Sequence, residues 1–184
     1  IFLLFLLKQG GEKISIIDNF NSKKIIYDPS LKIPNLTELL KYENSARKKG
    51  SGIEFDSLIG SWQFTSVWKS NSDKQDKIAS SLLRLFNATL EIKNNPNKKY
   101  GLINSIEFGV LKISFIGSGE LKGNQPLLPF YFEIIELKLR NKILLSRLLK
   151  IPEVKNRPFF ALIAKDEKGK WLSARGRGGG LALW

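Results

Sequence analysis

The sequence contains no cysteine, no histidine and no methionine. Without cysteine it has no disulfide framework, no thiol nucleophile and no thiolate metal site. Without histidine it lacks the side chain that most often serves as general base and zinc ligand. Cys₄ zinc sites, HExxH metalloproteases, Ser-His-Asp triads and Cys-His nucleophiles are therefore excluded. Because methionine is absent too, we expect the chain to be a processed product or a fragment.

The remaining catalytic patterns are weak. Ser66 and Lys69 have the spacing of a serine–lysine motif, but that motif begins a helix, and residues three apart on a strand face opposite ways. Glu133 and Glu136 fail as a carboxylate pair for the same reason. The sequence has no Gly-Lys-Ser/Thr phosphate-binding loop. We therefore predict a protein with no catalytic activity, no cofactor and no metal.

A hydrophobic run long enough to cross a bilayer is also missing. The run Ile1–Leu7 (IFLLFLL) is continuously apolar but far shorter than the ~20 residues that a spanning helix needs. We expect it to pack on the domain, and the alternative is the end of a truncated signal or anchor segment.

Acidic residues are few relative to basic ones. Lys and Arg number 30 against 17 Asp and Glu, giving a net charge of +13 and attraction to polyanions. The basic residues are scattered, and no run exceeds the three at residues 47–49. The first interpretation is a solvated lysine-rich surface, and the second is contact with an anionic membrane or an acidic protein. We do not expect specific nucleic-acid binding.

The pattern along the chain changes near residue 52. Asn35 or Thr37 can cap a helix from about Leu36 to Arg47, and residues 48–52 (KKGSG) are typical of a linker. We predict an N-terminal helical extension and linker over residues 1–52, followed by one domain over residues 53–184. A chain of this length can bury a core without disulfides or metal.

From residue 53 onward the hydrophobic period is two. Residues 61–69 alternate, with Trp62, Phe64, Ser66 and Trp68 on one face, as expected of a half-buried strand. Ser72 and Gln75 resemble a capping box for one helix with its apolar face at Ile78, Leu82, Leu85 and Phe86. Further strands are predicted at residues 88–93, 102–108, 111–116, 130–139, 143–149, 159–165 and 170–175, and the final run 181–184 indicates one more.

The connections between these strands are short and rich in turn residues, which favours antiparallel neighbours. About eight or nine strands with a single helix indicate a mainly β fold. We predict an antiparallel up-and-down barrel with one capping helix, because closure removes exposed strand edges. A β-sandwich is the alternative.

Two segments resemble the plastid-lipid-associated protein family, also called plastid fibrillins, of chloroplasts and cyanobacteria. Residues 58–66 (LIGSWQFTS) are similar to the family's opening strand, with Phe64 in place of its tyrosine. Residues 171–183 (WLSARGRGGGLAL) are similar to its closing hairpin, although the acidic residue usual there has no match. The resemblance implies a lipocalin-like barrel, an apolar ligand such as a lipid, prenylquinone or pigment, and a place at the periphery of thylakoid membranes.

Aromatic and arginine side chains are the candidate ligand-binding residues. Rings on the first strand either line a cavity, where an indole N–H can hold a head group, or simply fill the core. Three glycines at 178–180 suggest a positive-φ turn or a close approach, and the neighbouring arginines either anchor a ligand or are solvated. A single RGG copy is weak support for RNA binding. The candidates are Trp62, Phe64, Trp68, Phe130, Phe132, Trp171, Arg175 and Arg177.

The sequence thus predicts a protein that binds an apolar small molecule in a β-barrel without catalysing a reaction. One alternative is an assembly factor or scaffold whose barrel is filled by its own side chains and whose basic surface binds a photosynthetic protein. Another is a lyase-like protein that delivers a bilin, since delivery needs no cysteine on the carrier.

Overall fold

The computed structural model describes residues 33–70, 74–94, 100–123 and 126–184. The predictions for the run Ile1–Leu7 and the cap at Ser72 lie outside these residues. Pro34–Trp184 forms one compact unit that includes helix α2 (Leu36–Lys49). The domain boundary near residue 52 stays a prediction.

The described part of the chain is mainly antiparallel β-sheet, as the sequence predicted, with ten strands and two α-helices. The second helix is α3 (Lys77–Leu85), and short 3₁₀ turns cover Asp56–Leu58 and Val154–Asn156. The strands are β1 (Gly60–Gln63), β2 (Ser66–Trp68), β3 (Thr89–Asn94), β4 (Tyr100–Phe108), β5 (Leu111–Gly119), β6 (Leu127–Leu139), β7 (Lys142–Leu148), β8 (Phe159–Lys165), β9 (Leu172–Gly176) and β10 (Leu181–Leu183).

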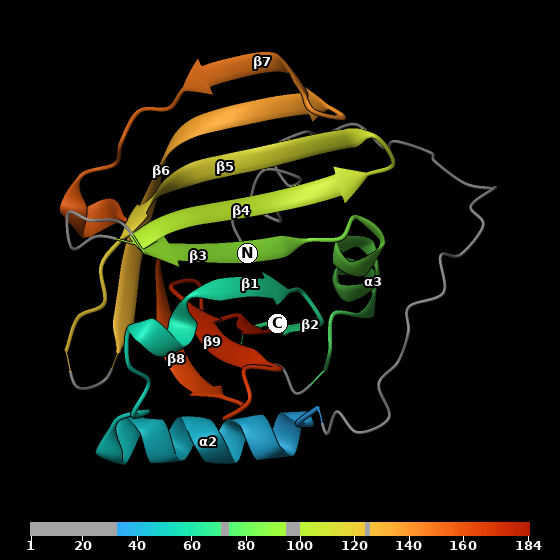
Figure 1. The fold of residues 1–184 in the computed structure, drawn as a ribbon. Coiled ribbons are helices and arrows are strands. Elements are labelled where there is room, and N and C mark those ends of the chain that lie inside the picture. Colours follow the sequence, from blue (N-terminus) through green and yellow to red (C-terminus); the bar gives the residue numbers. More distant parts are fainter. Residues whose placement is uncertain (1–32, 71–73, 95–99, 124–125) are drawn as a thin grey trace. The chain divides into compact units, whose positions relative to one another are not determined.

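The strands follow one another in the order β1-β3-β4-β5-β6-β8-β9-β10-β2, and β7 pairs with β6 beside this path. Strand β6 pairs with β8 at its start, with β5 from Phe130 to its end, and with β7 along its second half. Figure 1 shows β3–β7 curving over the top of the view and β8 and β9 crossing below them. The path is not closed by a β1–β2 ladder, so the predicted barrel is not confirmed.

The predicted single strand at residues 61–69 is two strands, which corrects the sequence interpretation. Successive amides on an extended chain point to opposite sides. The Phe64 amide donates to the Ala88 carbonyl at 2.8 Å, and the Thr65 amide donates to the Leu183 carbonyl at 2.8 Å. The chain therefore leaves the β3 side and joins the β10 side between these two residues. As a consequence β1 and β2 lie at the two ends of the strand order.

Helix α3 is present, but its start and its buried face differ from the prediction. Asp76 caps it by accepting a hydrogen bond from the Ala79 amide at 3.0 Å. Ile78, at 75% exposure, faces solvent. The buried residues are Ala79, Ser80 and Leu83. The small side chains of the first two let the helix lie close to the β2 backbone, where the Ser80 hydroxyl accepts from the Val67 amide at 3.0 Å. The exposed apolar residues are Ile78, Leu82 and Leu85.

The core lies between the two parts of the sheet and contains glycines opposite large rings. Gly117 is paired with Phe132 and Gly119 with Phe130 across β5 and β6. A Cβ on Gly117 would lie 1.9 Å from the Tyr131 carbonyl oxygen, at the point where the register of these strands shifts. The absence of a side chain at Gly117 lets the β6 backbone approach closely at this shift in register.

Candidate ligand-binding site

The phenylalanine candidates, Phe64 between β1 and β2 and Phe130 and Phe132 on β6, lie in the core and contact other rings. The Phe130 ring stacks on Phe160, with centroids 4.8 Å apart, and lies 5.4 Å from Phe132. Phe160 lies 5.3 Å from Trp184, which in turn lies 6.4 Å from Phe64. The rings therefore form one continuous cluster in the buried core.

The indole groups of the other two core candidates are also engaged. Trp62 donates its ring N–H to the Leu58 carbonyl at 2.8 Å. Trp171, only 9% exposed, lies 6.0 Å from the Tyr42 ring on α2. In the structure these side chains contact protein groups, so the predicted pocket around them stays a prediction.

Helix α2 carries an acidic residue, Glu43, that binds the candidate Arg175. Asn35 caps it, as one of the two sequence alternatives proposed, in a capping box with Glu38. Basic residues in its last turn offset the negative end of the helix dipole. The helix buries Leu39 and Glu43, four residues and one turn apart, so that a carboxylate faces strand β9.

Glu43 and Arg175 form a bidentate ion pair between α2 and β9. The Arg175 Nε donates to Glu43 Oε1 at 2.7 Å, and Nη2 donates to Oε2. The Arg47 Nη2 also donates to Oε1 at 2.7 Å, from one helical turn along. The side chains of Glu43 and Arg175 are 10% and 22% exposed. A paired fork of this kind is stronger and more directional than a single hydrogen bond.

The glycine turn supplies a further hydrogen-bond acceptor for Arg175. Its Nη1 donates to the Gly179 carbonyl at 2.6 Å. Gly179 has φ +77°, and a Cβ there would lie 2.4 Å from the Ser70 hydroxyl oxygen. Both the positive φ and the close approach expected from the glycine run are thus confirmed. Arg177 instead points to the surface and donates to the Arg157 carbonyl at 2.9 Å.

The surroundings of Glu43 keep its carboxylate charged. Burial by itself raises the pKa of Glu43, but hydrogen bonds from Arg175 and Arg47 and their positive charges lower it more. The pKa of Glu43 therefore lies below its ordinary value of 4.5. At neutral pH this anion offsets one of the two positive charges carried by Arg175 and Arg47.

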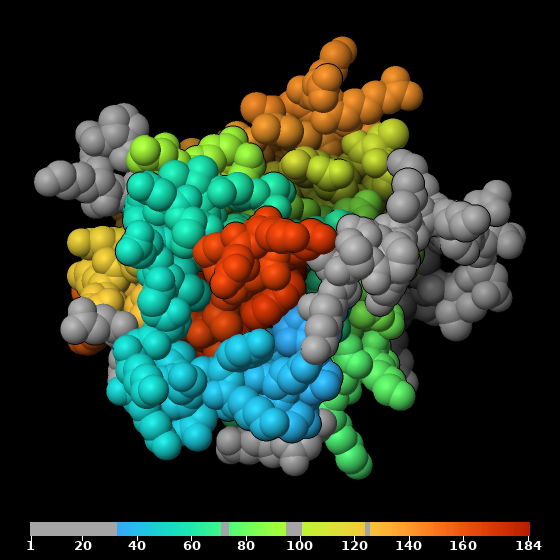
Figure 2. Space-filling view, turned by 60° about the horizontal axis from the view of Figure 1, so that its bottom comes forward, coloured from blue at the N-terminus to red at the C-terminus, as the bar shows by residue number. Residues whose placement is uncertain are grey.

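Two clefts lie on either side of this ion pair, between α2 and the sheet. Their volumes are about 520 and 420 Å³, and both are lined by Glu43, Arg47, Arg175 and Gly179. Figure 2 shows α2 lying against the red C-terminal segment in this region. The first cleft is completed by Leu36, Leu40, Asn44, Trp68, Lys69, Ser70 and Leu181, and the second by Ala46, Pro126, Leu127, Phe159, Ala161, Leu162, Ile163, Gly176 and Arg177.

The structure thus brings three of the sequence candidates to the clefts. Trp68 and Arg175 line the first, and Arg175 and Arg177 line the second. Sequence reasoning missed Glu43 as a functional residue. The available signal was an acidic residue on the leucine face of α2, four residues before Arg47.

Within residues 33–70, 74–94, 100–123 and 126–184, no group of three or more Asp or Glu side chains is placed to hold a metal ion. None of the helices there has both the length and the hydropathy required to cross a bilayer.

Comparison with known proteins adds no relative: no family model, no curated protein and no solved structure matches this chain.

Proposed function

We propose that the protein binds an apolar molecule with a polar or anionic head group, without catalysing a reaction, in the first cleft beside α2. The observation that carries this proposal is a cleft of about 520 Å³ with leucine and tryptophan on its walls and basic side chains among its lining. Ligand sites are typically concave and combine apolar walls with placed polar groups, and six of the eleven residues that line this cleft are polar or charged, which suits a ligand with a polar head group.

The lining residues give each part of such a ligand a partner. Leu36, Leu40 and Trp68 offer apolar area to a chain or ring. Arg47 and Lys69 are paired with Glu43 and Asp76, but their side chains remain 72% and 71% exposed and offer positive charge to the head group. Arg175 is already held by Glu43, so its role in our account is to fix α2 in place beside the cleft.

The ligand class and the finer fold are also part of the proposal. Strands β1 and β2 lie at the two ends of the strand order and are joined by only Phe64 and Thr65. Because these two residues bond to opposite ends of the sheet, we propose that they close it into a lipocalin-like barrel. The two motifs similar to plastid fibrillins support a lipid, prenylquinone or pigment as the ligand. Because the core rings pack against one another, we infer that this ligand binds outside the barrel interior, in contrast to the sequence prediction.

Replacing Leu40 by glutamine tests the cleft directly. We expect affinity for decylubiquinone, measured by titration calorimetry, to fall about tenfold because a polar amide replaces apolar wall. Lys41→Gln is the matched control on the neighbouring, exposed position outside the lining, and it is expected to bind normally. Equal affinities for both variants, or no lipid enriched in an organic extract of the purified protein, would count against the proposal.

The packing of the core rings against one another favours a second function, that of a scaffold or assembly factor. The ring cluster through Phe130 and Phe160 uses the space that a carried ligand would occupy in the barrel. The net charge of +13 suits an acidic protein partner. A stable acidic partner retained from native extract at low salt and released at high salt is the expected result, and retention independent of salt contradicts it.

A further inference from the structure

Strand β7 is an exposed edge of the sheet. Within the described residues it pairs only with β6, and all seven of its residues are exposed. Figure 1 shows it outermost at the top of the sheet. In an antiparallel strand, about half of the backbone N–H and C=O groups point away from the paired neighbour. Such an edge is a template for another strand.

The exposed side chains of β7 are mostly apolar. Leu148 is 80% exposed, and Ile143, Leu144 and Leu145 are each 55–57% exposed. The register shift in the β6–β7 pair leaves Leu144 without an opposite residue on β6. Apolar side chains consequently project from β7 on more than one side. An exposed apolar cluster of this size marks an interaction surface.

The chain segment that contains β7 carries only positive charge. Residues 137–152 include five basic residues and no acidic one; the basic residues are Lys138, Arg140, Lys142, Arg147 and Lys150. Pairing of two β7 strands would bring like charges together, which is destabilising. A second copy of this chain is therefore a poor partner for β7, whereas an acidic polypeptide is complementary to its charge.

The open backbone edge also argues against insertion of β7 into a bilayer. Hydrocarbon offers no partner for unpaired amides and carbonyls, and lipid-exposed sheet edges do not occur in that region. An extended polypeptide supplies those hydrogen bonds along the whole edge. The open backbone edge, the exposed leucines and the positive charge of β7 thus all favour an extended acidic polypeptide as the partner.

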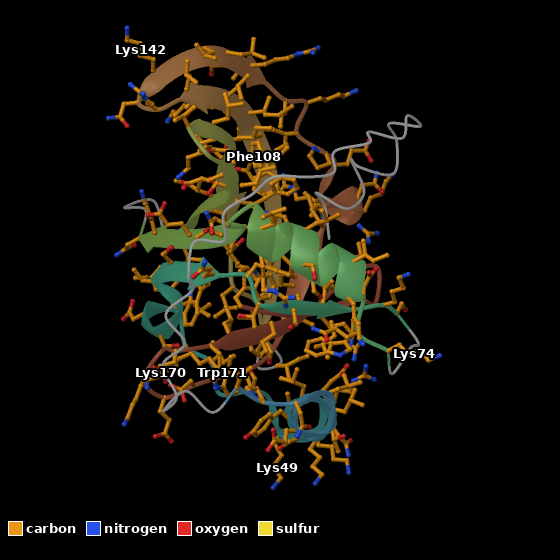
Figure 3. All side chains as sticks on the ribbon, turned by 90° about the vertical axis from the view of Figure 1, so that its right-hand side faces the viewer. Lys49, Lys74, Phe108, Lys142, Lys170 and Trp171 are labelled. Atoms are coloured by element: carbon orange, nitrogen blue, oxygen red, sulfur yellow. The ribbon has the colours of Figure 1, made fainter. Side chains whose placement is uncertain are left out.

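We propose that β7 docks an extended, acidic segment of a partner protein, which adds to the sheet as a further strand. Its alternate apolar side chains contact Ile143 and Leu148, which the register shift brings to one face of the sheet, and its carboxylates face Lys142 and Arg147 on the other face. This inference rests on the scaffold function above and is independent of ligand binding. Figure 3 shows Lys142, at the start of β7, and Lys49, at the end of α2, at opposite ends of the view.

A displayed library of random 12-residue peptides, selected on the full chain, tests the proposal. Enriched peptides are expected to alternate apolar and acidic residues and to slow hydrogen exchange of β7 amides when bound. Leu148→Glu is expected to weaken binding of the best peptide at least about tenfold. Ile78→Glu on α3, at a position of similar exposure, is the matched control and is expected to bind normally. Thermal melts establish that both variants are folded.

Four outcomes overturn the proposal. The first is that no peptide is enriched, and the second is that the slowed hydrogen exchange falls outside β7. The third is that the wild type binds phosphatidylglycerol vesicles and Leu148→Glu does not. The fourth is that the wild type sediments as a dimer and Leu148→Glu as a monomer. Quinone titration of Leu148→Glu separates this failure from that of the ligand proposal, because the α2 cleft is unchanged in this variant.

Discussion

Replacing Glu43 by alanine is expected to lower the free energy of unfolding by about 3 kcal/mol, as for other buried pairs that lose one partner. The substitution leaves the largely buried Arg175 guanidinium with the Gly179 carbonyl as its remaining hydrogen-bond partner, and it removes the bond that joins α2 to β9. Glu54→Ala, at an exposed position, is the control and is expected to change stability by less than about 0.5 kcal/mol. Urea unfolding at pH 7 measures both.

A double-mutant cycle with Arg175→Met isolates the pair. If the two residues act together, the double variant loses clearly less stability than the sum of the single losses. Additive losses would mean that α2 is held on the sheet by its apolar contacts alone, and the role assigned to the ion pair would then be wrong.

The same pair predicts a dependence on pH. Because the pKa of Glu43 is lower in the folded protein than its ordinary value of 4.5, its contribution is complete above that value and is lost as the pH falls through the folded pKa. The stability difference between the wild type and Glu43→Ala should therefore be constant near neutral pH and shrink on acidification below about 4.5. A difference that grows towards acid pH contradicts the assignment.

Truncating Phe130 to alanine is the second change with a large expected effect, a loss of about 3–5 kcal/mol. Its ring is 4% exposed and contacts both Phe160 and Phe132, so its removal leaves a cavity in a packed cluster. Phe108→Ala, at 38% exposure, is expected to cost less. A loss for Phe130→Ala no larger than for Phe108→Ala in the ligand-free protein would show that the ring lines open space, as an interior ligand pocket requires.

Local patterns in the sequence predicted much of the fold. Period-two alternation located strands such as Phe159–Lys165 with their correct bounds, because alternation records which side of a sheet is buried. The glycine run predicted the tight turn around Gly179, because only glycine tolerates that φ beside Ser70. These features depend on neighbouring residues, which the sequence displays directly.

Features that depend on distant contacts were missed. The division of residues 61–69 into two strands requires Ala88 on one side and Leu183 on the other. The apolar spacing in α3 suggested the wrong buried face, since small residues at the β2 contact decide its orientation. Glu43 and Arg175 lie 132 positions apart. Their pairing, and with it the clefts on either side, follows from how α2 packs on the sheet.

Quenching of tryptophan fluorescence by decylubiquinone, compared between Trp68→Phe and Trp184→Phe, tests most directly whether the guest lies beside α2. Trp68 lines the first cleft, whereas Trp184 belongs to the ring cluster of the core. We expect saturable quenching in the wild type. The quenching should persist in Trp184→Phe and be largely lost in Trp68→Phe. Quenching that survives in Trp68→Phe and disappears in Trp184→Phe would place the guest in the core and contradict the account.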